Sequence, residues 1–155
     1  MLYIFDKDNT LVSGMGNRPA NKPEEQQPLP GVVKKIQQLI KDGHDVAVAS
    51  NQGGVSFGYI TDDQARDLVR DACIKCGIPR SNFLYCPFMP GGKFSEDYRH
   101  LESDRKPQPG MLIGLMRMMN VKPRDTIMVG DQESDRQAAR AAGVYFEWAN
   151  EFFSK

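Results

Sequence analysis

The chain has 155 residues, of which 40% are hydrophobic and 26% are charged. A domain of this length buries about 70% of the surface of its unfolded chain, so one core is sufficient and we expect a single domain over residues 1–155. The 20 basic and 20 acidic side chains cancel, so the chain has no net positive charge that would attract a polyanion.

The N-terminus and the cysteines predict where the protein works. The hydrophobic run over residues 2–5 is too short for a signal sequence or a membrane span, and charged residues follow it at once. Three cysteines are an odd number without a disulfide framework, which agrees with a reducing compartment. We therefore expect a cytoplasmic protein, and the oligomeric state stays open.

Predicted strands and helices alternate along the chain. Strands are expected where short β-prone apolar runs end in polar turns, and helices where apolar residues recur at helical spacing between capping residues. The expected strands are 2–5, 45–50, 82–86, 126–130 and 144–148, and the expected helices are 30–43, 61–76, 109–119 and one that ends at 142. This alternation predicts a three-layer α/β domain, with a doubly wound (Rossmann-like), mostly parallel five-stranded sheet and no large cap domain.

Two stretches lack this periodicity. Residues 12–30 are rich in Gly, Pro, Asn and Gln, and long loops of this kind are usually functional or disordered. Residues 13–29 could form a flap over a site or be disordered, and both interpretations are open. Residues 87–108 are irregular as well, and they carry Arg105-Lys106-Pro107 near their end.

Polar residues follow three of the expected strands. Asp6 and Asp8 come directly after the first, Ser50 and Asn51 end the second, and Asp131 follows the fourth. In an open α/β sheet, ligands bind beyond the carboxyl ends of the strands, where these side chains would meet. Each residue also has a plain structural explanation, because Asp, Asn and Ser are common in turns and Asp is a common helix N-cap.

Together these residues resemble the motifs of a known family. The segments Asp6-Lys-Asp8-Asn-Thr10, Ser50-Asn51, Lys106-Pro107 and Gly130-Asp131-Gln-Glu-Ser-Asp135 resemble the four motifs of the haloacid dehalogenase (HAD) superfamily of phosphatases, in the family's order. The resemblance extends to about residue 147. It implies a phosphoric monoester hydrolase that needs Mg²⁺.

The resemblance implies a role for each acidic residue. Asp6 would attack phosphorus to form an aspartyl-phosphate, and Asp8 would protonate the leaving oxygen and later deprotonate the hydrolytic water. The carboxylates of Asp6 and Asp131 and the carbonyl of Asp8 would hold Mg²⁺. Asp135 lies four residues after Asp131, on the same helix face, and would reach the metal through water or orient Lys106.

The phosphate itself would be bound by amides and a cation. Ser50 and Asn51 would donate backbone amides to the phosphate oxygens. Lys106 would bring positive charge to the nucleophile and the phosphate, and the proline after it favours an extended backbone that projects its side chain. The plain alternatives are an ordinary turn and one surface lysine among many.

Within the superfamily, the chain resembles the branch that holds heptose-bisphosphate phosphatase, histidinol phosphatase and the phosphatase domain of polynucleotide kinase/phosphatase. Arg105 corresponds to a substrate-contacting arginine of the heptose enzymes, which makes it a candidate substrate-binding residue. Of the zinc ligands in that branch only Cys86 remains, so we expect no structural zinc. Phe57-Gly58 replaces the family's Arg-Gly, which argues against a heptose bisphosphate.

The leading hypothesis is hydrolysis of a small sugar-phosphate-like metabolite. A polynucleotide 3′-phosphatase is the enzymatic alternative, because Lys93, Arg99, Arg105 and Lys106 could form a basic patch beside the site, although the neutral net charge argues against it. A phosphate- or metal-binding module without turnover is the alternative of another class. The cysteine pair at residues 73 and 76 falls in the last turn of a helix, where packing is the expected role.

Overall fold

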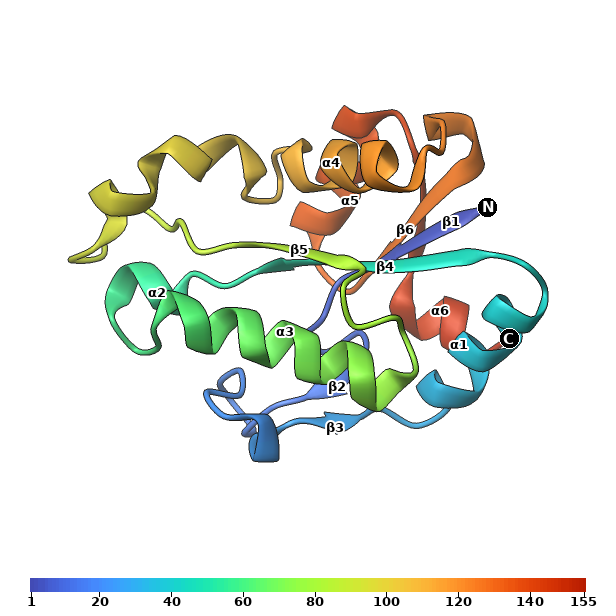
Figure 1. Ribbon diagram of the computed structural model, residues 1–155, viewed down its shortest axis with the longest axis horizontal. Helices are drawn as coiled ribbons and strands as arrows, with labels where there is room; N and C mark the ends of the chain where they lie inside the picture. Colours follow the sequence, from blue (N-terminus) through green and yellow to red (C-terminus); the bar gives the residue numbers. More distant parts are fainter.

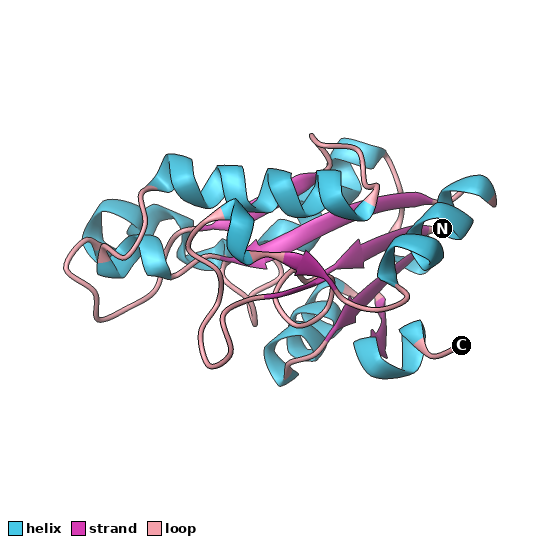
Figure 2. Cartoon of the chain, turned by 90° about the horizontal axis from the view of Figure 1, so that it is seen from below, coloured by secondary structure: helices cyan, strands magenta, loops and turns pink.

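A five-stranded parallel sheet forms the centre of the computed structural model, which describes residues 1–155, with the strand order β5-β4-β1-β6-β7. The strands are β1 (Leu2–Phe5), β4 (Asp45–Asn51), β5 (Phe83–Cys86), β6 (Thr126–Gly130) and β7 (Tyr145–Trp148). Every pairing in this sheet is parallel, so the strand arrows run the same way (Figure 2). The predicted fold class and all five expected strands are confirmed.

Helices cover both faces of the sheet (Figure 1). One face carries α1 (Val32–Lys41), α3 (Asp62–Cys76) and α6 (Ala149–Phe153), and the other carries α4 (Gly110–Met119) and α5 (Glu133–Ala142). The short helix α2 (Gly54–Phe57) directly follows β4. The expected N-cap of α3 is present, because Thr61 and Gln64 form a reciprocal capping box.

Strand β1 explains why the core has two halves. Leu2 and Ile4 are fully buried in the cluster under α4 and α5, whereas Phe5 is fully buried in the cluster under α1, α3 and α6. Side chains alternate between the two faces of a strand, so a strand in the middle of such a sheet must be apolar throughout. This requirement accounts for the uninterrupted apolar run at the start of the chain.

The register of β1 determines where the polar loops meet. Phe5 is opposite Val48 in β4 and opposite Val129 in β6. Strands β1 and β6 therefore end close to the same level, β4 continues three residues further to Asn51, and the residues at these ends project from one edge of the sheet.

The segment between β1 and α1 contains regular structure, so the prediction of a wholly irregular stretch there was wrong. It forms a small hairpin of β2 (Val12–Ser13) and β3 (Gln27–Pro28), with a 3-10 turn, Pro23–Glu25, before β3. The buried Gln26 attaches it to α3, because its amide donates to the carbonyl of Leu68 at 3.0 Å and to Asp71 Oδ2 at 2.9 Å. Hydrogen bonds of one buried polar side chain thus replace the apolar pattern that the segment lacks.

Other parts of the chain also differ from the prediction. The irregular stretch after β5 contains a 3-10 helix, Ser95–Asp104, and the chain ends in α6, neither of which was expected from the sequence. None of the helices is long and apolar enough to cross a bilayer.

Candidate active site at the carboxyl ends of the strands

A buried lysine connects the loops at the sheet edge. Lys106 is 3% exposed, and its Nζ lies 2.8 Å from Asp6 Oδ1 and 2.7 Å from Asp135 Oδ1. It also donates to the carbonyl oxygen of Ala49 in β4 at 2.8 Å. Three acceptors use all three protons of the ammonium group, which is how a buried cation is tolerated. The loop after β1, the end of β4 and the start of α5 are therefore held at one point.

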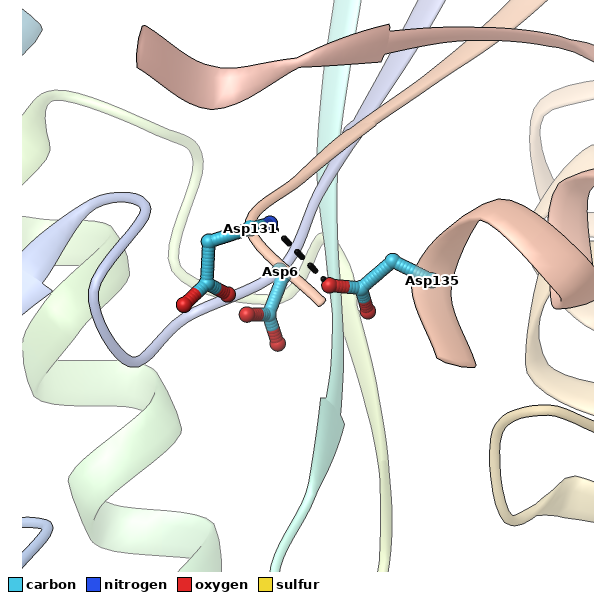
Figure 3. Close-up of side chains that lie close together, drawn as sticks. All are labelled: Asp6, Asp131 and Asp135. Atoms are coloured by element: carbon cyan, nitrogen blue, oxygen red, sulfur yellow. Dashed lines mark hydrogen bonds between the residues drawn. The ribbon is translucent and has the colours of Figure 1, made fainter. Parts of the chain in front are cut away.

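Asp6 and Asp131 bring their carboxylates together at the sheet edge (Figure 3), and Asp6 is the one that pairs with this lysine. Ligand atoms of Asp6, Asp131 and Asp135 all lie within 4.8 Å of one another. The Thr10 hydroxyl lies 3.5 Å from both Asp6 Oδ2 and Asp131 Oδ1. Burial raises the pKa of Asp6 to about 6, and the nearby positive charge of Lys106 opposes that rise. The arrangement places carboxylate oxygens face to face, as a metal ion with oxygen ligands requires.

Asp135 has both of its oxygens engaged by the protein. One pairs with Lys106, and the other accepts from the backbone amides of Asp131 at 3.2 Å and Gln132 at 3.0 Å. Gln132 is the N-cap of α5 and forms a capping box with Asp135. Of the two roles expected for Asp135, the geometry therefore matches the orientation of Lys106. The plain alternative for Asp131, that it is the N-cap, is wrong.

Asp8 lies in different surroundings from Asp6. Its side chain is 23% exposed, and Oδ1 lies 2.7 Å from the ammonium nitrogen of Lys7, whose side chain is fully buried. The second acceptor of Lys7 is Gln26 Oε1. The sequence does not reveal this contact, because a lysine between two aspartates has the appearance of a solvated residue and Gln26 is 19 positions away.

Asn51 acts on the loop that carries Lys106. Its Nδ2 donates to the Lys106 carbonyl at 3.1 Å, and the Lys106 amide donates to its Oδ1 at 3.0 Å. The buried Ser50 hydroxyl accepts from Gln52 Nε2 at 2.8 Å. The side chains of both residues bind protein groups. Phosphate binding by their backbone amides stays a prediction.

A pocket of about 620 Å³ opens beside Asp8. One wall comes from the segment after β2 and the other from α2 and the turn that follows it. Besides Asp8 it is lined by Arg18, Pro19, Ala20, Asn21, Asn51, Gln52, Gly53, Gly54, Phe57, Tyr59, Ile60 and Met89. The segment that was expected to be either a flap or disordered thus contributes a wall of this pocket.

Comparison with known proteins identifies the family. A family model described as HAD-hydrolase-like matches residues 103–146. The heptose-1,7-bisphosphate 7-phosphatase of Haemophilus ducreyi is 31% identical over 145 residues, which cover 91% of this chain and 78% of that protein. The corresponding Escherichia coli K12 enzyme is 32% identical over 144 residues, with coverage of 91% and 74%. The chain belongs to the HAD superfamily.

Solved structures agree with this assignment. The D,D-heptose 1,7-bisphosphate phosphatase of B. bronchiseptica, complexed with magnesium and phosphate, superposes with a TM-score of 0.76 at 26% identity, over 94% of this chain and 78% of that one. A HAD-like phosphatase from Mesorhizobium loti gives a TM-score of 0.77 at 24% identity, over 92% and 68%, and supports the fold. The protein is thus a HAD phosphatase, a phosphoric monoester hydrolase.

The basic patch suggested for this HAD phosphatase is not formed. Lys106 is buried, and Arg99 pairs with Glu96 at 2.6 Å and with Glu102 at 3.7 Å. The guanidinium of Arg105 is hydrogen-bonded to the backbone, because its Nη1 donates to the carbonyl of Phe88 at 3.2 Å. Lys93 is the one exposed residue of the four without an ion pair, so the four cations do not together form a surface for a polyanion.

The three thiols are buried and free. Burial raises the pKa of Cys73 to about 12 and that of Cys76 to about 11, which matches the packing role expected at the end of α3. The Cys86 thiol lies 3.4 Å from the carbonyl oxygen of Leu101.

Proposed function

We propose that the protein is a Mg²⁺-dependent phosphomonoesterase that transfers the phosphoryl group to Asp6 and acts on a small, sugar-phosphate-like metabolite. The observation that carries the proposal is the different setting of two neighbouring carboxylates. Asp6 is fixed by Lys106 beside Asp131, whereas Asp8 faces the pocket. A nucleophile needs the first setting and an acid for the leaving group needs the second.

The charges at the sheet edge fit a bound divalent cation. Three carboxylates converge there against the single positive charge of Lys106. Asp135 is saturated by protein donors, so Asp6 and Asp131 are the residues left to hold the ion, with the Asp8 carbonyl as a further oxygen ligand. When bound, Mg²⁺ would supply positive charge to the phosphate oxygens as the reaction proceeds.

The protein groups account for two successive displacements at phosphorus. An oxygen of Asp6 attacks phosphorus, the bond to the leaving alcohol breaks, and Asp8 gives its proton to the alcohol oxygen. Water then attacks the aspartyl-phosphate, Asp8 takes a proton from that water, and inorganic phosphate and free Asp6 result. Asp8 ends each cycle in the protonation state in which it began.

Other residues would hold the reacting groups in place. Lys106 orients Asp6 through a 2.8 Å ion pair, and Asn51 fixes the backbone of Lys106. The backbone amides of Ser50 and Asn51 would donate to the phosphate oxygens. A role for Arg105 in substrate binding would require its guanidinium to leave the Phe88 carbonyl.

The relatives support a sugar phosphate as the substrate class, because those from Haemophilus ducreyi and Escherichia coli K12 are named for a heptose bisphosphate. The alternative of a polynucleotide 3′-phosphatase is less well supported, since Lys106 is buried, Arg99 is paired with glutamates and Arg105 donates to a carbonyl, which leaves Lys93 as the one exposed and unpaired cation of the four.

The proposal is tested by phosphate release with Mg²⁺ from sugar phosphates, histidinol phosphate, nucleotides and a 3′-phosphorylated oligonucleotide. Asp6→Asn should lower kcat by roughly 10⁴-fold or more, as loss of a nucleophile does. The matched control is Asp45→Asn, because Asp45 is exposed at the opposite end of β4. No release from any substrate by folded wild-type protein would contradict the proposal and favour a binding module.

A further inference from the structure

The pocket beside Asp8 is placed to receive the leaving alcohol. Asp8 is the proposed acid for the leaving oxygen and it lines this pocket, so the rest of the alcohol extends into the same space. Its volume of about 620 Å³ is within the range of small-molecule sites. The side chains of its walls therefore report on the chemistry of the substrate beyond the phosphate.

Two aromatic rings stand at one wall of the pocket. Phe57 and Tyr59 are stacked, with ring centroids 6.0 Å apart and planes 16° apart. The Tyr59 side chain is largely in solvent, with 72% of the residue exposed. Ile60 and Met89 add apolar surface to the same pocket. An exposed ring next to apolar neighbours gains from covering by a flat partner.

The only basic side chain in the lining of the pocket is already paired with a carboxylate. Arg18 is the one basic side chain in its lining, and Glu25 holds it through two contacts of 3.2 Å. Its Nη1 also donates to the Pro19 carbonyl at 2.9 Å. Arg105 donates to Phe88 as described above. A second phosphate inside the pocket would therefore meet apolar or uncharged polar residues, or Arg18, which is already paired with Glu25.

We propose that the sugar-phosphate-like substrate carries a planar ring on its alcohol part, either a nucleobase or another arene, and no second phosphate. The inference rests on the proposed phosphatase function and specifies its substrate. The ring stacks on Tyr59 and Phe57, while the phosphate lies beyond Asp8 at Asp6.

The test compares 3-phenylpropyl phosphate with propyl phosphate. The two leaving alcohols are of nearly equal acidity, so the ratio of their kcat/KM values reports binding of the ring. We expect a ratio of about five or more, because stacking of one ring contributes about 1 kcal/mol or more. Tyr59→Ala should bring the ratio close to one. Tyr145→Ala is the matched control, because Tyr145 is 60% exposed at the opposite end of the sheet, and it should keep the ratio.

Further substrates separate the sources of the ring. Nucleoside 5′- and 3′-monophosphates that outperform ribose 5-phosphate would assign a nucleobase, and a preference confined to phenylpropyl phosphate would assign another arene. A sugar bisphosphate hydrolysed faster than its monophosphate would overturn the inference. A phenylpropyl-to-propyl ratio of one would overturn it too, while the phosphatase function stands. Failure to hydrolyse either alkyl phosphate, while a sugar phosphate is hydrolysed, would overturn the inference alone, and failure on all of these substrates would overturn the function itself.

Discussion

Asp6 and Asp8 are two residues apart in one loop, yet each is held by its own buried lysine in a different environment. Asp6 pairs with Lys106 among further carboxylates, and burial raises its pKa to about 6. Asp8 pairs with Lys7, is 23% exposed and faces the pocket. Two carboxylates whose surroundings differ in this way can take different roles in one reaction.

The partners of the two lysines explain the difference. Lys106 is shared with Asp135, so with Asp131 nearby the surroundings of Asp6 keep excess negative charge and attract a cation. The other partner of Lys7 is the neutral Gln26, so the pair of Lys7 and Asp8 carries no net charge. The Asp6 side is thereby suited to a metal, whereas the Asp8 side has no excess negative charge that would attract one.

Among the variants that separate the role of Asp8 from that of Asp6, replacement of Asp8 should change the reaction rate most. Asp8→Asn should lower kcat on an alkyl phosphate by about 10²- to 10⁴-fold, the usual contribution of a general acid or base. The first step with p-nitrophenyl phosphate should be spared, because nitrophenolate leaves without a proton. Stopped-flow measurement of nitrophenolate release checks this outcome. An equal loss of the first step for both substrates would mean that Asp8 does not act as the acid.

Lys106→Met should disrupt the surroundings of Asp6 and leave those of Asp8 intact. It leaves Asp6 and Asp135 buried without their cation, which should lower the free energy of unfolding by about 3–5 kcal/mol. Urea unfolding checks the value, with the exposed Lys34→Met as the control. Lys106→Met with wild-type stability would contradict the account of the buried ion pairs.

The stability of the metal-free protein should depend on pH through Asp6. Its folded pKa is about 6 against an ordinary value of 3.8, so the folded state holds the proton more tightly. This contribution is fully present below about pH 4 and falls by about 2–3 kcal/mol as the pH rises to about 6. Urea unfolding across this range should show a steeper fall for wild type than for Asp6→Asn. Equal slopes would show that Asp6 has an ordinary pKa.

Lys7→Met should give the smallest effect, because Asp8 is partly exposed and water can replace the lysine. We expect a loss of about tenfold in kcat on alkyl phosphates, the size of one hydrogen bond to a charged group. The loss should be smaller in the first step with p-nitrophenyl phosphate. An equal loss for both substrates would indicate a purely structural lysine.

The sheet and the residues that gather around Asp6 could be predicted from the sequence, whereas the contacts that surround Asp8 could not. Asp6, Asn51 and Asp131 come at or just after the ends of strands, and parallel strands bring such residues together wherever the helices lie. Gln26, in contrast, lies in a segment without periodicity, and its contacts with Lys7 and Leu68 span 19 and 42 positions. Hydrogen bonds of single polar residues leave no repeating pattern, so only the tertiary structure reveals them.

The most direct test of the account is the mass of the Asp8→Asn protein, quenched in acid after mixing with p-nitrophenyl phosphate and Mg²⁺. This leaving group needs no acid, while the absence of the base should slow hydrolysis of the intermediate. The account predicts protein that carries one phosphoryl group, mapped to Asp6. A phosphoryl group on another residue, or turnover that persists in Asp6→Asn, would contradict it.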